Sequence, residues 1–171
     1  MKKQISLVLT VVFIFLVGAA FAQKDKSKRP SPPAKAEGTI DGVKVMIDYS
    51  SPAVKGRKIF GGLQPYGEVW RTGANEPTSI EFDKNVKIEG KELAKGKYAL
   101  YSIPGEAEWT IIINKKHQGW GTEYDQAQDV FRVKVKPGKT DKLVEQLNIA
   151  IEGSNVVIRW ENTKVAFSVK G

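Results

Sequence analysis

The runs KYALYSI, at residues 97–103, and WTIIIN, at residues 109–114, decide the fold of this chain. Both are rich in aromatic and β-branched residues, which favour extended strands. The segment Pro104-Gly105-Glu106-Ala107 lies between them and has the composition of a turn, so the two runs predict a β-hairpin. Residues 111–113 are three consecutive isoleucines, apolar on both faces, which places the second strand inside a sheet.

The strand signal continues on both sides of this hairpin. Apolar side chains recur at every second position in five further segments, as in antiparallel strands with one face in the core and one in water. These positions are Val43, Val45 and Ile47; Phe131, Val133 and Val135; Leu147, Ile149 and Ile151; Val156, Ile158 and Trp160; and Val165, Phe167 and Val169. Short strands are also expected at residues 78–82 and 85–88, and only residues 140–146 are compatible with a helix. The chain is therefore predicted to be an all-β protein, an antiparallel, jelly-roll-like β-sandwich with one long ordered loop.

The first 22 residues have the pattern of an export signal. Lys2 and Lys3 precede an apolar stretch over residues 5–17, and Ala20-Phe21-Ala22 is a small-x-small cleavage triplet. We expect a signal peptide at residues 1–22 and a soluble periplasmic or extracellular protein, with an uncleaved N-terminal anchor as the alternative. No later segment is expected to insert stably into a membrane. The absence of cysteine excludes disulfides and thiolate metal sites.

Charge and composition divide the rest of the chain. Residues 23–37 are rich in proline and lysine and lack hydrophobic spacing, which predicts a disordered linker before a single domain at residues 38–171. The net charge of +8 is concentrated in the N-terminal part, since 7 of the 27 basic residues and 2 of the 19 acidic residues precede Gly38. The domain therefore has nearly equal numbers of basic and acidic residues, and a nucleic-acid partner is not expected.

Two irregular stretches interrupt the strand pattern. Residues 50–77 are rich in glycine, proline and aromatic residues, and residues 114–129 hold the single histidine of the chain. Ordered loops of this length are usually functional. We expect the two stretches to form a concave ligand surface, with a small molecule, a glycan or a peptide as the partner.

Several runs within and near these stretches resemble a known family. They are GRKIFG at residues 56–61, YGEVWRTGANE at 66–76, YALYSIPG at 98–105, EWT at 108–110 and QGWG at 118–121. The chain resembles the exported bacterial proteins catalogued as domain of unknown function 2911. The resemblance covers nearly all of the domain and implies export and a single domain. It implies no reaction, ligand or catalytic residue.

Three functions remain open at this point. The first is a non-catalytic binding module that uses aromatic faces and directional polar groups. The second is a hydrolase or proton-transfer enzyme with Glu76 as base, Arg71 as anion holder and His117 assisting. The third is a structural protein of the cell envelope. The candidate ligand-binding residues are Arg57, Tyr66, Trp70, Arg71, Asn75, Glu76, His117, Trp120 and Tyr124.

Structural roles compete for the same residues. Arg71 and Glu76 are equally explained if they pair with each other or with backbone carbonyls and so pin the long loop, and Trp70 by a plug at the end of the sandwich. Trp109 and Trp160 are expected in the core, because they lie within strand patterns. A single histidine is weak support for zinc, and the acidic residues at 123–129 do not follow a calcium-loop spacing, so no metal or cofactor is expected. No catalytic serine or phosphate-binding motif is present.

Overall fold

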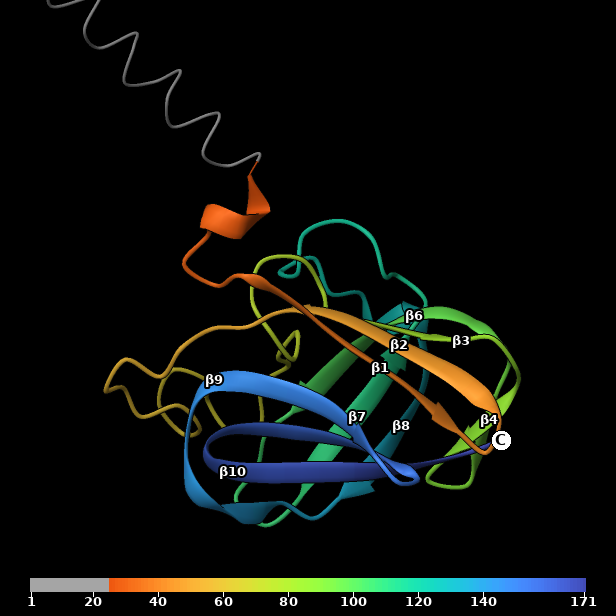
Figure 1. Ribbon diagram of the computed structural model, residues 1–171. Coiled ribbons are helices and arrows are strands. Elements are labelled where there is room, and N and C mark those ends of the chain that lie inside the picture. Colours follow the sequence, from red (N-terminus) through yellow and green to blue (C-terminus); the bar gives the residue numbers. More distant parts are fainter. Residues whose placement is uncertain (1–24) are drawn as a thin grey trace, which may run out of the picture.

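Two antiparallel β-sheets form the body of the protein. The computed structural model describes residues 25–171, and the predicted signal peptide lies outside the described residues. The first sheet has six strands in the spatial order β1 (Pro33–Ile40), β2 (Val43–Ser50), β3 (Ser79–Phe82), β6 (Gly96–Ile103), β7 (Trp109–Asn114) and β8 (Asp129–Val135). The second has four, in the order β5 (Lys91–Leu93), β4 (Val86–Ile88), β10 (Asn155–Lys170) and β9 (Gly138–Glu152). The prediction of an all-β sandwich is confirmed (Figure 1).

The predicted central hairpin is present as β6 and β7. Leu100 pairs with Ile113 and Ser102 with Ile111 in an antiparallel register. Strand β7 also pairs with β8, so it has a neighbour on each side, and Ile111, Ile112 and Ile113 are all fully buried. The three isoleucines are buried because one face of the strand lies in the main core and the other lies under a smaller apolar cluster on the outer face of the sheet.

The second sheet differs from the prediction in its long strands. Strand β10 runs without interruption through the two segments predicted as separate strands, and it bends at bulges on either side of Glu161, which has a left-handed φ of 55°. Residues 140–146 belong to β9 and not to a helix. Within them Val144 pairs with Glu161 of β10, and the Glu145 carbonyl accepts from the backbone N–H of Val54, whereas a helix of this length would be unstable alone.

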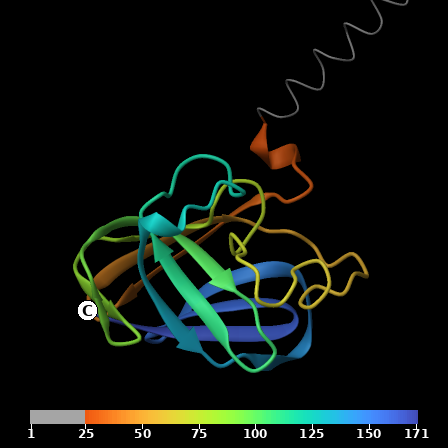
Figure 2. The same cartoon turned by 180° about the vertical axis from the view of Figure 1, so that it is seen from behind.

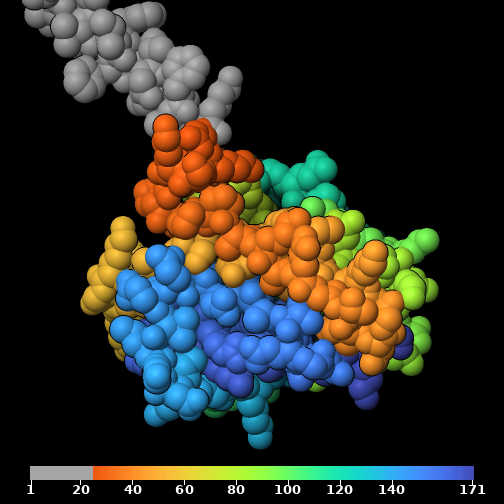
Figure 3. Space-filling view, viewed as in Figure 1, coloured from red at the N-terminus to blue at the C-terminus, as the bar shows by residue number. Residues whose placement is uncertain are grey.

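Strand β1 begins inside the segment predicted as a disordered linker. It starts at Pro33 and pairs with β2 along its whole length, from Pro33 with Ser50 to Ile40 with Val43. Figure 3 shows β1 lying beside β9, and a methyl group at Gly38 would touch the Ile151 side chain at 3.0 Å. The prediction of disorder is therefore wrong for residues 33–37, because an available sheet edge supplies hydrogen bonds that composition does not reveal.

The core contains an aromatic cluster at one end. Trp109 comes from β7 and Trp160 from β10, and both are almost fully buried, as predicted. The long loop contributes Phe60, whose ring centroid lies 4.8 Å from that of Trp109, and Trp70, which stacks on Trp160 at 5.7 Å. The loop is therefore ordered because its own aromatic residues complete the core at this end.

Candidate functional site

The two irregular stretches lie side by side at one end of the six-stranded sheet (Figures 1 and 2). The backbone N–H of Gly121 donates to the carbonyl oxygen of Asn75 at 3.1 Å and so joins them directly. A methyl group at Gly121 would collide with the Arg71 side chain and lie 2.6 Å from the same Asn75 oxygen. Glycine is thus required at this position by the close approach of the two loops.

A short pairing with β6 fixes the positions of Trp70 and Arg71. The backbone N–H of Trp70 donates to Ser102 O at 2.7 Å, and the N–H of Ser102 donates to Trp70 O at 2.9 Å. Successive side chains of an extended segment point to opposite faces. Trp70 therefore enters the core, where its Nε1 donates to Gly73 O at 3.0 Å, and Arg71 lies on the outer face of the sheet near Tyr101.

A cavity of about 280 Å³ opens beside Arg71. It is lined by Gln64, Val69, Trp70, Arg71, Tyr101, Gly121, Thr122 and Tyr124. The Nε of Arg71 is enclosed and has no hydrogen-bond partner among the described residues. Burial lowers the pKa of the half-buried Arg71 guanidinium from its ordinary value, and the nearby Tyr101 offsets part of this effect. Desolvation without a counter-charge is unfavourable, so a ligand in this cavity would meet an unsatisfied cation.

The part of the cavity wall formed by Tyr124 is held by a polar network around Asp129. Tyr124 donates its hydroxyl to Asp129 Oδ2 at 2.7 Å, Arg132 Nε donates to the same oxygen at 2.8 Å, and Asn114 Nδ2 donates to Asp129 Oδ1 at 2.8 Å. The Tyr124 ring meets the Tyr101 ring edge to face at 4.9 Å. Burial and the hydrogen bond to Asp129 raise the pKa of Tyr124 to about 12, so its hydroxyl is protonated at neutral pH.

The backbone between Arg71 and Glu76 is strained. Thr72, a fully buried β-branched residue, has a φ of 52°, and Asn75 has a φ of 60°. Thr72 is held by its hydroxyl, 2.9 Å from that of Ser102, and by its carbonyl, which accepts from Thr78 Oγ1 at 2.9 Å. Asn75 donates to Ser50 Oγ at 3.1 Å. Strain that the surroundings hold in place is often found at functional loops.

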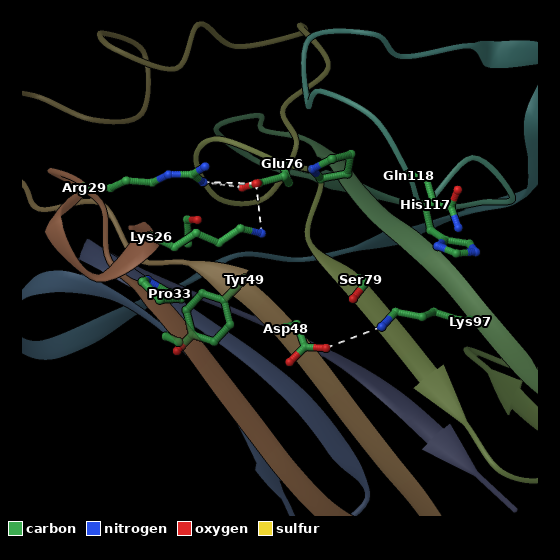
Figure 4. Close-up of a pocket in the computed structure, with 13 residues that line it drawn as sticks. Lys26, Arg29, Pro33, Asp48, Tyr49, Glu76, Ser79, Lys97, His117 and Gln118 are labelled. Atoms are coloured by element: carbon green, nitrogen blue, oxygen red, sulfur yellow. Dashed lines mark hydrogen bonds and ion pairs between the residues drawn. The ribbon is translucent and has the colours of Figure 1, made fainter. Parts of the chain in front are cut away.

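Glu76 lies in a different and larger cavity, of about 560 Å³. Its carboxylate accepts from Arg29 Nη1 at 2.8 Å and 3.0 Å and pairs with Lys26 Nζ at 3.1 Å (Figure 4). Burial raises the pKa of Glu76, but its own backbone N–H, Lys26 and Arg29 outweigh that effect and hold the pKa below its usual value. Glu76 is therefore paired with the N-terminal segment and not with Arg71, which was one of the structural alternatives.

The three residues of the enzyme hypothesis are not brought together. Arg71 lines the smaller cavity, whereas Glu76 and His117 line the larger one. Figure 4 shows His117 on the side of that cavity away from Arg29. The other charged pair in the larger cavity is Lys97 with Asp48, at 3.5 Å, so both of its carboxylates are already paired with cations.

Of the remaining candidate residues from the sequence, one is bonded within its own loop and two are exposed to solvent. Arg57 donates to the carbonyl oxygens of Ala53 at 2.6 Å and Val54 at 2.9 Å, so it fastens its own loop. Tyr66 and Trp120 are 39% and 47% exposed and present aromatic surface to solvent. Sequence reasoning missed Tyr101 and Arg132 as residues of the cavity region, and the outward-facing positions of β6 and β8 were the signal available for both.

Residues 25–171 contain no group of three or more histidine or acidic side chains placed to hold a metal ion. Within the same residues, no helix has the length and apolar character needed to cross a membrane.

Comparison with known proteins assigns the chain to a sequence family. Neither the curated proteins nor the solved structures gave a match. One family model matches residues 31–169, from just before β1 to the last residues of β10, and it therefore covers both sheets and both irregular stretches. The chain belongs to the family described as "Protein of unknown function (DUF2911)".

Proposed function

We propose that this protein is a non-catalytic binding module that takes a small ligand in the cavity beside Arg71. One observation carries the proposal. The guanidinium of Arg71 is half-buried beside an open cavity of about 280 Å³, and its enclosed Nε has no partner among the described residues. A buried donor without an acceptor costs free energy in the unliganded protein, and hydrogen bonds from a ligand to the rest of this half-buried guanidinium would offset that cost.

The walls of the cavity support this function because hydrogen bonds within the protein hold two of their residues in place. Tyr124 is fixed by Asp129 and Arg132, and Gly121 is fixed by its hydrogen bond to Asn75. Pre-organised walls reduce the side-chain entropy lost on binding. Trp120, adjacent in sequence to the lining residue Gly121, presents an exposed aromatic ring.

The enzyme alternative is less well supported. A general base near neutral pH needs a raised carboxyl pKa, whereas the pKa of Glu76 is held low by its own backbone and by Lys26 and Arg29. Arg71 and Glu76 also line different cavities, although they are only five positions apart. A binding role for Arg71 requires neither Glu76 nor His117.

Export belongs to the same proposal. The basic residues Lys2 and Lys3, the apolar stretch and the Ala20-Phe21-Ala22 triplet support cleavage after Ala22 and a periplasmic or extracellular location. The mass of the protein recovered from a cell fraction would show this directly. A mature N-terminus at Gln23 is expected, and full-length protein retained in the membrane would contradict it.

A thermal-shift screen tests the binding function. Mature protein is heated with sugars, short peptides, small organic acids and their neutral analogues, since a ligand that prefers the folded state raises Tm. Backbone ¹H–¹⁵N spectra then locate each hit. We expect at least one class to move the amides of Gly121 and Thr122, which line the cavity. If every hit leaves those two amides unmoved, or if no compound raises Tm, the proposed function is wrong.

A further inference from the structure

The arginines of the domain differ in whether their side chains have an acceptor within the protein. Residues 25–171 contain five, and four of them donate to an acceptor within the protein. Those four pairs are Arg29 with Glu76, Arg57 with the Ala53 and Val54 carbonyls, Arg132 with Asp129, and Arg159 with Glu152. Arg71 alone among them has no hydrogen bond or ion pair with another described residue, and it lines the cavity of about 280 Å³.

Arg71 is therefore the one charged residue in the lining of this cavity. None of its other lining residues is ionised at neutral pH, since they are glutamine, threonine, glycine, valine, tryptophan and two tyrosines. Burial raises the pKa of Tyr101, so its hydroxyl keeps its proton and can donate. An arginine fork with a neutral hydroxyl donor beside it matches the two oxygens of an anion.

The volume and the lining of the cavity limit which anions it can bind. The cavity volume of about 280 Å³ lies at the lower limit for drug-sized ligands, at roughly 300 Å³. Val69 and the rings of Trp70, Tyr101 and Tyr124 supply apolar surface around the polar groups. One cation balances one negative charge, whereas a phosphate dianion would need a second cation that the lining does not contain.

We propose that the ligand is a small organic monocarboxylate, with its carboxylate on Arg71 and the Tyr101 hydroxyl and its apolar part against Val69 and the aromatic walls. This assignment rests on the proposed binding function and names its ligand class. It excludes neutral glycans and dianionic phosphates as the preferred ligands of this cavity.

The test titrates the mature protein with matched acids and amides. The probes are acetate, butyrate, benzoate and indole-3-acetate, each beside its own amide, with inorganic phosphate and glucose added. The shifts of the Gly121 and Thr122 amides report occupancy. We expect at least one acid to bind about ten-fold or more tightly than its amide, since hydrogen bonds between charged groups are stronger than neutral ones.

Three variants identify the source of that preference. Arg71→Met should abolish it, and Arg71→Lys should weaken it, because lysine keeps the charge without the planar fork. Arg159→Met is the matched control. It removes the same charge from β10 in the other sheet and should leave binding unchanged.

The outcomes separate the two proposals. An amide that binds as tightly as its acid, phosphate that binds more tightly than every carboxylate, or an acid preference that persists in Arg71→Met would overturn the carboxylate assignment. If none of the acids moves the two amides while a sugar or peptide does, the binding function stands and the assignment is wrong. If no compound of any class moves them, both are wrong.

Discussion

The unpartnered guanidinium of Arg71 makes a counterintuitive prediction about stability. Replacing Arg71 with methionine should stabilise the ligand-free protein, although it removes a charged group from the proposed ligand site. Methionine keeps an unbranched stem to pack against Gly121, and it removes the enclosed Nε that has no acceptor among the described residues. Sites that bind ligands often carry such a cost in the unliganded state.

The magnitude follows from the burial of the group. A buried donor left without an acceptor costs about 1–3 kcal/mol. The Arg71 side chain is only half-buried and part of the guanidinium remains hydrated, so we take the lower end, about 1 kcal/mol. For a domain of this size, that gain corresponds to a rise in Tm of roughly 3 °C.

Urea unfolding followed by tryptophan fluorescence measures this gain in buffer free of carboxylates. Arg132→Met is the matched control, because it removes the same charge from the same side of the sheet but leaves Asp129 without its cation. Asp129 is largely buried, so we expect that control to lose about 2 kcal/mol. If Arg71→Met loses 1 kcal/mol or more, Arg71 has a structural partner and the reasoning behind its ligand role fails.

Three further predictions concern the residues around the two cavities. Glu76→Gln should free the N-terminal segment held by Arg29, and the heteronuclear NOE of that segment should fall. In the wild-type protein the same fall should occur only as the pH drops through the lowered pKa of Glu76. An NOE that stays unchanged in both experiments would contradict the contact. Gly121→Ala should cost about 1–3 kcal/mol in urea unfolding through collision with Arg71 and the neighbouring loop, and a neutral result would place the loops further apart. Trp70→Ala should cost about 3–5 kcal/mol, because it empties the stack on Trp160, and a smaller loss would show that the loop does not complete the core.

The sheets could be predicted because their signal is local. Alternation at Val43, Val45 and Ile47 requires only that one face of β2 be buried, and all three side chains are buried. Trp109 and Trp160 were placed in the core by the same argument. Strand pairing beyond the β6–β7 hairpin was not predictable, because β3 pairs with β2 and β6 across gaps in the sequence that no periodicity encodes.

The candidate site was predictable in outline only. The two irregular stretches were identified from glycine, proline and aromatic content, and they do lie side by side. The partner of Glu76 was not identified, because Arg29 lies 47 positions earlier in a segment whose composition indicates disorder. Tyr101 was missed for a different reason. A tyrosine within an apolar strand is usually a residue of the main core, whereas Tyr101 lies on the outer face of the sheet and lines the smaller cavity.

The segment WRTGANE shows why the proposed binding function depends on Arg71. Its neighbours all have partners within the protein. Trp70 stacks in the core, Gly73 lies so close to Thr78 that a methyl group would be 2.8 Å from the hydroxyl, and Glu76 holds the N-terminal segment. These contacts fix the backbone on both sides of Arg71 and hold its side chain at the cavity. Since a fixed backbone around an unsatisfied cation gives no stability to the unliganded fold, this arrangement supports the proposal of a ligand that satisfies it.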